Sequence, residues 1–184
     1  YNIVDRIYIT RIPEVGTVAL GAVGLCFPLI IMITAFSNLF GSGGAPIFSI
    51  YRGMNENGRA QIVVNTSFTM VCACGIVLMT IGLVFARPLL VLLGASESAL
   101  VYAYPYMMIY LIGTLPSMIT TGMNPFINAQ GYATTGMISV MIGAVANLIL
   151  DPLFIFVFHL GIEGAAVATV ISQVMSACFV ILFL

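Results

Sequence analysis

The chain has 184 residues, of which 61% are hydrophobic and 6% are charged, and its formal net charge is −1. Soluble domains carry about 25% charged residues, so this composition excludes a soluble globular fold and indicates an integral membrane protein. The five basic residues form no basic run, and the sequence therefore gives no sign of a nucleic-acid partner.

The first predicted helix covers residues 1–12 and is too short to cross a membrane. A helix rises 1.5 Å per residue and needs about 20 residues to span the hydrocarbon layer. Pro13 follows this segment, and the sequence opens without an initiator Met. We therefore expect a chain that lacks the start of its first helix and is a piece of a longer protein.

Long uncharged segments predict the remaining helices. Residues 15–51 and 60–86 contain no charged residue, and a polar segment separates them. Residues 98–150 also lack charge, but this segment is too long for one helix, so we expect two helices that meet near residues 128–131. The lengths favour helices over a β-barrel, whose strands need only about 10 residues each. The predicted fold is an all-α membrane protein, a six-helix bundle with a truncated first helix, and the predicted helices cover residues 1–12, 17–51, 60–93, 98–130, 134–159 and 164–184.

The second predicted helix contains the segment Gly41-Ser-Gly-Gly-Ala-Pro46. Glycine and proline in a membrane helix can break it and free backbone groups, which then need partners in the protein or in a cavity. Small residues can equally allow two helices to pack closely. The sequence leaves both interpretations open.

We call the two membrane faces A and B. Face A holds the predicted loops near Pro13, Gly94 and Gly161, and face B holds those near Asn55 and Gly131. The positive-inside rule counts Lys and Arg in the short loops, and two arginines fall at or near each face. Charge alone therefore does not orient the chain.

Asp151 lies directly after the long uncharged segment and before Pro152. A charged carboxylate that faces lipid costs on the order of 3 kcal/mol or more, so such a residue is normally protonated, paired or directed at a polar cavity. Pro152 removes the helical hydrogen bond to the Leu148 carbonyl and is predicted to bend this helix. In an alternative interpretation, Asp151 and Pro152 begin a new helix as its N-cap and first residue.

Other polar residues share the depth of Asp151. Counted at 1.5 Å per residue from the turn that follows, Asp151 and Thr169 both lie roughly 12 to 15 Å inside face A. Asn147 lies one helical turn from Asp151 on the same side of the helix. The same counting brings Asp5 and Tyr106 to a similar level, so we expect these five side chains to form one site.

Two carboxylates in a low-dielectric layer can hold a proton, because both cannot ionise cheaply. Alternatively, a Na⁺ ion can neutralise Asp5 and Asp151, with oxygen atoms of Asn147 and Thr169 completing its shell. Either ion could couple a gradient to a conformational change. Taken singly, Asn147 and Thr169 are equally typical of hydrogen bonds between helices.

Nearer face B, the residues Asn124, Asn128 and Gln130 form a second polar group. They fit the end of a helix, and Asn124 is also a candidate for the path of a substrate. The only histidine, His159, lies at a loop, and the sequence shows no nucleophile–base pair and no set of metal ligands that would indicate an enzyme. We expect neither enzymatic activity nor an organic cofactor.

Several segments, in this order and spacing, resemble the MATE (multidrug and toxic compound extrusion) transporters across essentially the whole chain. Each segment alone is a weak signal, and the ordered set is more specific. The segments are Val4-Asp-Arg-Ile-Tyr, Leu20-Gly-Ala-Val-Gly-Leu, Gly41-Ser-Gly-Gly-Ala, Tyr51-Arg-Gly-Met-Asn-Glu-Asn-Gly-Arg-Ala60, Asn128-Ala-Gln-Gly, Asn147-x-x-x-Asp151-Pro and Gly164-Ala-Ala-x-Ala-Thr169.

The resemblance implies two six-helix bundles related by pseudo-twofold symmetry, of which residues 1–184 would be the N-terminal one and the C-terminal bundle would lie outside this chain. It also implies cytosolic loops on face B and a location in the bacterial plasma membrane. The resemblance further implies that the family's cation-responsive site corresponds here to Asp5, Asn147, Asp151, Thr169 and Tyr106. Arg6 stands where the family commonly has a small polar residue, and this departure weakens the assignment of Asp5.

These observations predict a secondary active transporter that exports amphipathic organic cations by alternating access, coupled to Na⁺ or H⁺. Its expected partners are small organic cations, the lipid bilayer and the C-terminal bundle of the same protein. An alternative within the same superfamily is a flippase of lipid-linked oligosaccharides, which would favour a cavity lined with arginine. A purely structural membrane subunit would leave Asp151 facing neither a cavity nor a partner.

Overall fold

The computed structural model describes Tyr8 and residues 16–184, and the predicted helix at residues 1–12 with Asp5 and Arg6 lies outside the described residues except for Tyr8. The described part contains six α-helices and one π-helix. They are α2 (Gly16–Gly53), α3 (Asn57–Leu92), α4 (Glu97–Ile112), α5 (Thr114–Ala129), α6 (Ala133–Pro152), the π-helix η1 (Leu153–Val157) and α7 (Gly161–Phe183).

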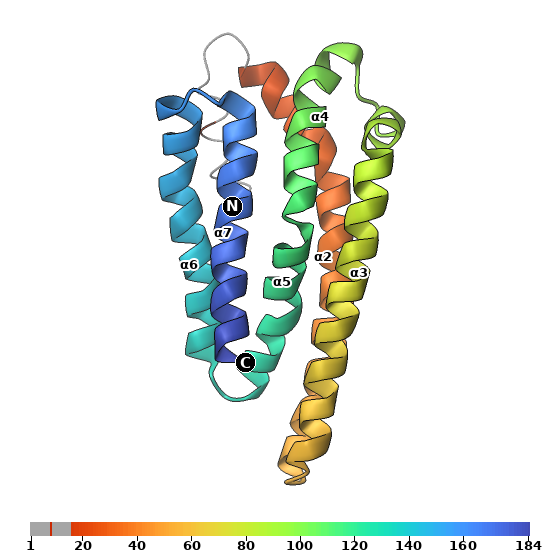
Figure 1. Ribbon diagram of the computed structural model, residues 1–184, viewed down its shortest axis with the longest axis vertical. Coiled ribbons are helices and arrows are strands. Elements are labelled where there is room, and N and C mark those ends of the chain that lie inside the picture. Colours follow the sequence, from red (N-terminus) through yellow and green to blue (C-terminus); the bar gives the residue numbers. More distant parts are fainter. Residues whose placement is uncertain (1–7, 9–15) are drawn as a thin grey trace.

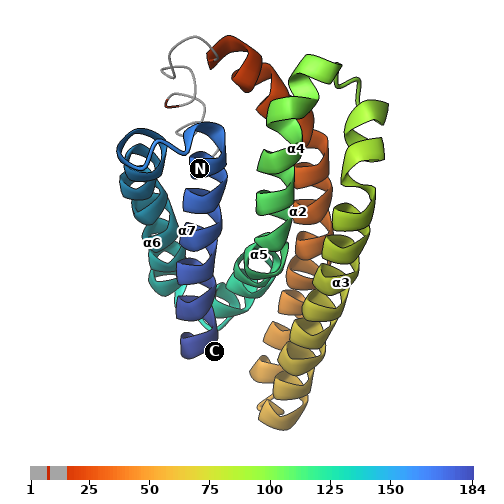
Figure 2. The ribbon, with the colours of Figure 1, turned by 45° about the horizontal axis from the view of Figure 1, so that its top comes forward.

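The helices form a bundle in which α4 and α5 lie between two antiparallel pairs (Figures 1 and 2). One pair is α2 with α3, and the other is α6 with α7. The α2–α3 hairpin extends past the α5–α6 turn at face B (Figure 1). Among the described residues, four helices are long and apolar enough to cross a membrane, and there are five such spans if the bent pair α4–α5 is counted as one. The protein is therefore a multi-pass membrane protein.

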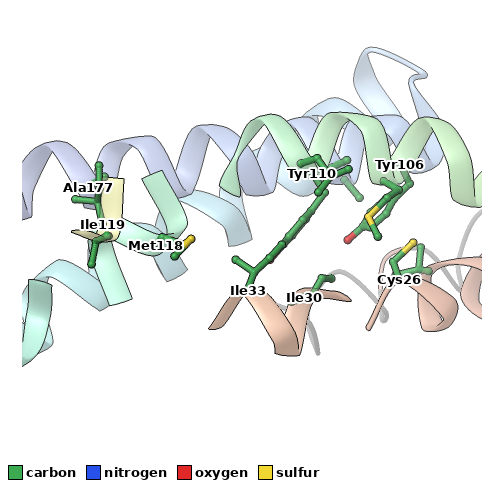
Figure 3. Packing of buried hydrophobic residues seen from close by; sticks show 14 of the residues in the cluster. Cys26, Ile30, Ile33, Tyr106, Tyr110, Met118, Ile119 and Ala177 are labelled. Atoms are coloured by element: carbon green, nitrogen blue, oxygen red, sulfur yellow. The ribbon is translucent and has the colours of Figure 1, made fainter. Parts of the chain in front are cut away.

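Buried apolar side chains of α2, α3, α4, α5, η1 and α7 form one core cluster, part of which is drawn in Figure 3, whereas α6 contributes none. Cys26 and Ile30 on α2 face Tyr106 on α4, while Ile119 on α5 lies beside Ala177 on α7. Large apolar side chains also remain exposed on the described helices other than α5, as expected where the surrounding solvent is lipid. Because lipid-facing and packed helix faces are both apolar, only burial in the structure identifies the faces that contact each other.

The segment predicted as one helix over residues 98–130 is divided into α4 and α5, which meet at Gly113 with a bend of 53°. The single-helix prediction was wrong here for a local reason. Pro116 has no N–H and leaves the Ile112 carbonyl without its helical partner. Gly113 also packs against α7, where an added Cβ would lie 2.7 Å from the Val170 side chain and 2.8 Å from Gln173 Oε1.

The glycine-rich segment of α2 does not break the helix, which continues through Pro46 to Gly53. Its glycines instead allow close packing. A Cβ on Gly41 would overlap the Gly122 carbonyl oxygen of α5, and a Cβ on Gly44 would lie 2.6 Å from the ring of Phe126. Ser37 also donates a hydrogen bond of 2.7 Å to the Met118 carbonyl of α5. Of the two interpretations left open by the sequence, close packing is the one that the structure supports.

Replacing Gly41 by Ala is expected to force α2 and α5 apart, because the obstacle is backbone and cannot rotate away. We expect a loss of about 1–3 kcal/mol in stability, as for other overpacked sites. Gly43→Ala is the matched control, since an added Cβ at Gly43 meets nothing within 4 Å. Thermal unfolding of the purified full-length protein measures both, and equal melting temperatures for the two variants would contradict the close contact.

Candidate functional site

Asp151 is fully buried between α6 and α7, where it contacts Asn147. The Asn147 Nδ2 atom donates to Asp151 Oδ1 at 3.0 Å and to Thr169 Oγ1 at 3.3 Å. The Thr169 hydroxyl in turn donates to the Ala165 carbonyl at 2.9 Å. The structure therefore brings together three of the five side chains predicted to share a site, and we call them the Asp151 cluster (Asn147, Asp151 and Thr169).

The helix around Asp151 changes its winding directly after the carboxylate. Asp151 lies inside the last turn of α6, and Pro152 ends this helix, so the interpretation of Asp151 as the N-cap of a new helix is wrong. The chain continues in the wider π-helix η1, with a backbone hydrogen bond of 3.0 Å from Phe158 N to Leu153 O. An irregular turn of this kind is frequent at functional sites of membrane helices.

The start of α7 lies tightly against η1. A Cβ on Gly164 would lie 2.8 Å from the backbone carbonyl group of Phe154. Gly136 and Gly143 are buried on the face of α6 that also carries Asn147 and Asp151. Gly164 thus lets α7 approach η1, whereas Gly136 packs against α5, where an added Cβ would lie 2.9 Å from Asn124 Oδ1.

The Asp151 cluster supplies oxygen atoms of the kind that Na⁺ binds, from one carboxylate, one carboxamide and one hydroxyl. In the present arrangement the amide of Asn147 directs its N–H groups at Asp151 and Thr169. Its Oδ1 atom is buried and has no hydrogen-bond partner within the described part of the chain. A rotation of this amide would turn Oδ1 towards the cluster, so the residues fit a hard monovalent cation after that rotation.

Tyr106 is fully buried on α4, and its ring stacks on Tyr110 with centroids 6.2 Å apart. The Tyr110 hydroxyl accepts a hydrogen bond of 3.5 Å from Gln173 Nε2. Gln173 lies one helical turn after Thr169 on α7 and lines the same cavity as Tyr110 and Thr169. Asp5, the remaining predicted member, lies outside the described residues.

Sequence reasoning missed Gln173, which is buried on α7. The signal that could have identified it is its spacing, because residues i and i+4 share a helix face and Thr169 was already a candidate. Its depth did not match that of Asp151, and depth was the criterion that selected the other residues.

A polar cavity of about 150 Å³ lies beside the Asp151 cluster, between α2, α4, α5 and α7. Two buried acceptors at its wall, Gln173 Oε1 and Thr120 Oγ1, have no hydrogen-bond partner within the described part of the chain. Unsatisfied buried acceptors are costly, so they indicate a place for water or for a donor group of a ligand. The described residues that line the cavity carry no formal charge: Ile30, Thr34, Tyr110, Ser117, Thr120, Thr121, Thr169, Gln173 and Ser176.

Asn124 takes part in a polar network between α5 and α6 near face B. Its Nδ2 atom donates to the Gly136 carbonyl at 2.9 Å and to Ser139 Oγ at 2.7 Å, and its Oδ1 accepts from Asn128 at 3.2 Å. The Ser176 hydroxyl of α7 donates to the Ser139 carbonyl at 2.6 Å. Asn124 therefore joins helices, and it also lines a second hollow of about 280 Å³ with Thr120 and Thr121 of the cavity wall.

Comparison with known proteins gives consistent results. The MatE family model matches residues 1–153. The chain is 30% identical over 164 residues to the multidrug export protein MepA of Staphylococcus haemolyticus, covering 89% of this chain and 36% of that protein. It is 28% identical over 176 residues to the FAD transporter of Shewanella oneidensis, covering 94% of this chain and 38% of that protein.

The solved structures that match are also MATE transporters. A crystal structure of MATE in the bent conformation matches with a TM-score of 0.94 and 28% identity, over 100% of this chain and 40% of that one. An outward-facing multidrug resistance MATE family transporter matches with a TM-score of 0.89 and 27% identity, over 98% of this chain and 39% of that one. The chain thus spans well under half the length of the proteins it matches and has the fold of one lobe.

The network around Asn124 predicts a stabilising role for this residue. Asn124→Leu keeps the approximate volume but removes the bonds to Gly136 and Ser139, so we expect a loss of about 1–2 kcal/mol in stability. Asn128→Leu removes one exposed bond and should cost much less. Melting temperatures of the full-length variants test this, and an unchanged value for Asn124→Leu combined with altered export would favour the substrate-path interpretation instead.

Proposed function

The chain belongs to the MatE family of membrane transporters, and from that premise we propose that the whole protein is a secondary active antiporter. It exports amphipathic organic cations by alternating access, driven by Na⁺ or H⁺ that enters at the Asp151 cluster. The described bundle is one lobe, and a second bundle of the same protein is its partner across the substrate path. The bacterial relatives support a location in the bacterial plasma membrane. The resemblance to the family implies that face B lies in the cytosol.

One observation carries this proposal: Thr169 belongs both to the Asp151 cluster and to the wall of the polar cavity. An ion that binds at Asp151 changes the hydrogen bonds of Asn147, and Asn147 is bonded to Thr169. A change at the ion site therefore reaches the cavity through a single side chain. An ion can shift the protein between two conformations only if it interacts more favourably with one of them, and this direct contact is a means to do so.

The π-helix after Pro152 is the element that we expect to respond. Its wider hydrogen bonds can return to α-helical spacing with a local rotation, and this rotation would change the path of residues 153–160 relative to α7. Asp5 is expected to join the Asp151 cluster from the first helix. A second carboxylate there would make proton retention or Na⁺ binding more favourable, because two close negative charges repel each other.

The cavity favours the positively charged end of an amphipathic molecule. Gln173 Oε1 and Thr120 Oγ1 accept hydrogen bonds, and the Tyr110 ring provides a π face for a cation. Drug-sized ligands occupy pockets of about 300–1,000 Å³. A cavity of about 150 Å³ therefore holds only the head group, and the remainder of the cargo extends towards the second lobe.

Anionic cargo fits this cavity less well. A dinucleotide such as the one named for the Shewanella relative, or a lipid-linked oligosaccharide with its diphosphate, needs positive charge at the binding site. None of the described residues that line the cavity is Arg, Lys or His. This difference supports organic cations over both alternatives.

Asp151→Asn is expected to uncouple export from the ion gradient, because the amide keeps the shape of the carboxylate but carries no negative charge. Efflux of a cationic dye by the full-length protein in proteoliposomes, driven by an imposed Na⁺ or H⁺ gradient, should fall about tenfold or more, in line with the loss of one charge-assisted interaction. Glu163→Gln is the matched control, since Glu163 is an exposed acid in the first turn of α7. Export by Asp151→Asn at the wild-type rate would refute the coupling role.

The choice between Na⁺ and H⁺ can be tested by ligand-induced stabilisation. If Na⁺ binds at the Asp151 cluster, NaCl should raise the melting temperature of the full-length protein more than KCl at equal ionic strength. Thr169→Val should reduce that difference, because it removes one oxygen ligand at nearly constant volume. If NaCl and KCl raise the melting temperature of the wild type equally, and export requires a pH gradient, the coupling ion is H⁺.

A further inference from the structure

A groove of about 220 Å³ lies at face B, separate from the Asp151 cluster and the central cavity. It is bounded by the α2–α3 turn, by Gln130 at the end of α5 and by Leu184 after α7. Its floor is apolar and includes Phe48 and Val64. The groove therefore combines a polar rim with an apolar base.

Arg52 supplies the only formal charge among the described residues that line this groove. Its guanidinium carbon lies 5.9 Å from the centroid of the Phe48 ring, a cation–π contact that holds it over the groove. The nearby acid, Glu56, forms an ion pair with Arg59 at 3.1 Å and leaves the charge of Arg52 without a carboxylate partner in the described part of the chain. The groove is thus net positive.

Carboxamides surround this positive charge. Asn57, Gln61 and Asn65 recur at intervals of four residues and therefore share one face of α3, and all three are exposed and line the groove. Gln130 adds a fourth carboxamide from α5. Their N–H groups are donors suited to the oxygen atoms of a phosphate, whereas an apolar lipid tail could not satisfy them.

The groove lies at the level where lipid head groups are found. The α2–α3 hairpin extends past the α5–α6 turn (Figure 1), and its tip still exposes Ile50, Met54 and Ile62, with exposed fractions of 57%, 64% and 64%. Exposed apolar side chains of this size indicate contact with the membrane rather than with water. A groove beside them, with a cationic rim and an apolar floor, matches a lipid whose head carries phosphate.

We propose that this groove binds the phosphate of an acidic phospholipid, with Arg52 as the charged contact and the carboxamides of α3 as additional donors. Basic pockets between membrane helices are known sites for such head groups. Val64, which is half-buried at the groove, contacts the upper part of an acyl chain, while Phe48 is buried beneath Arg52. Binding at this place ties the α2–α3 turn to the end of α5.

Native mass spectrometry of the full-length protein in detergent tests the proposal, with dioleoyl-phosphatidylglycerol and dioleoyl-phosphatidylcholine as probes. The wild type should retain phosphatidylglycerol in preference to phosphatidylcholine. Arg52→Gln should weaken phosphatidylglycerol binding about tenfold, the effect of losing one charge-assisted contact, while Arg52→Lys should recover most of it. Arg87→Gln removes an exposed arginine outside the groove and should bind like the wild type.

Equal phosphatidylglycerol binding by the wild type and Arg52→Gln, with both eluting as folded protein, overturns the proposal. A parallel melting series with inorganic phosphate separates the two sources of phosphate. If inorganic phosphate stabilises the wild type but not Arg52→Gln, and phosphatidylglycerol shows no preference, the site is one for free phosphate and the lipid assignment is wrong. None of these readouts depends on transport, so failure here leaves the proposed antiport untouched.

Discussion

A carboxylate within the hydrocarbon layer requires polar partners, and the requirement of Asp151 determines how α6 and α7 must meet. Asn147 and Thr169 provide hydrogen bonds of 3.0 and 3.3 Å in this seam. Beside this seam, Gly164 of α7 packs against the backbone of η1, directly after Pro152. The polar cluster and this close backbone packing therefore lie next to each other in the contact of α7 with α6 and η1.

Glycines also allow close helix packing on the side of the bundle that contains α2, α4 and α5. Gly41 of α2 contacts the backbone of α5 at Gly122, and Gly113 allows the bend between α4 and α5 to pack against α7. The bend directs the start of α5 away from the axis of α4, and the polar cavity lies where α2, α4, α5 and α7 diverge. Thr169 stands between this cavity and Asp151, which places the candidate ion site and the candidate cargo site in direct contact.

The polar residues divide by depth into groups with different physical tasks. The Asp151 cluster, deep on the side of face A, holds the buried carboxyl group that we propose as the ion site. The network of Asn124, Ser139 and Ser176 fastens α5, α6 and α7 nearer face B. The hydrogen bonds near face B hold that end of α6 in place, and the irregular π-helix lies at its other end. We therefore expect movement within this lobe on the side of face A.

The sequence alone determined that the chain is a membrane protein and where its long apolar segments lie, because hydrophobic length and a rise of 1.5 Å per residue are local properties, but it missed the division of residues 98–130 into α4 and α5. It also identified Asn147, Asp151 and Thr169 as neighbours in depth. Only the tertiary structure decided that these three side chains face each other, that the glycine segment of α2 packs instead of breaking, and that Gln173 belongs to the cavity. Those outcomes depend on direction around each helix, and this direction is set by the faces that pack together and not by sequence spacing.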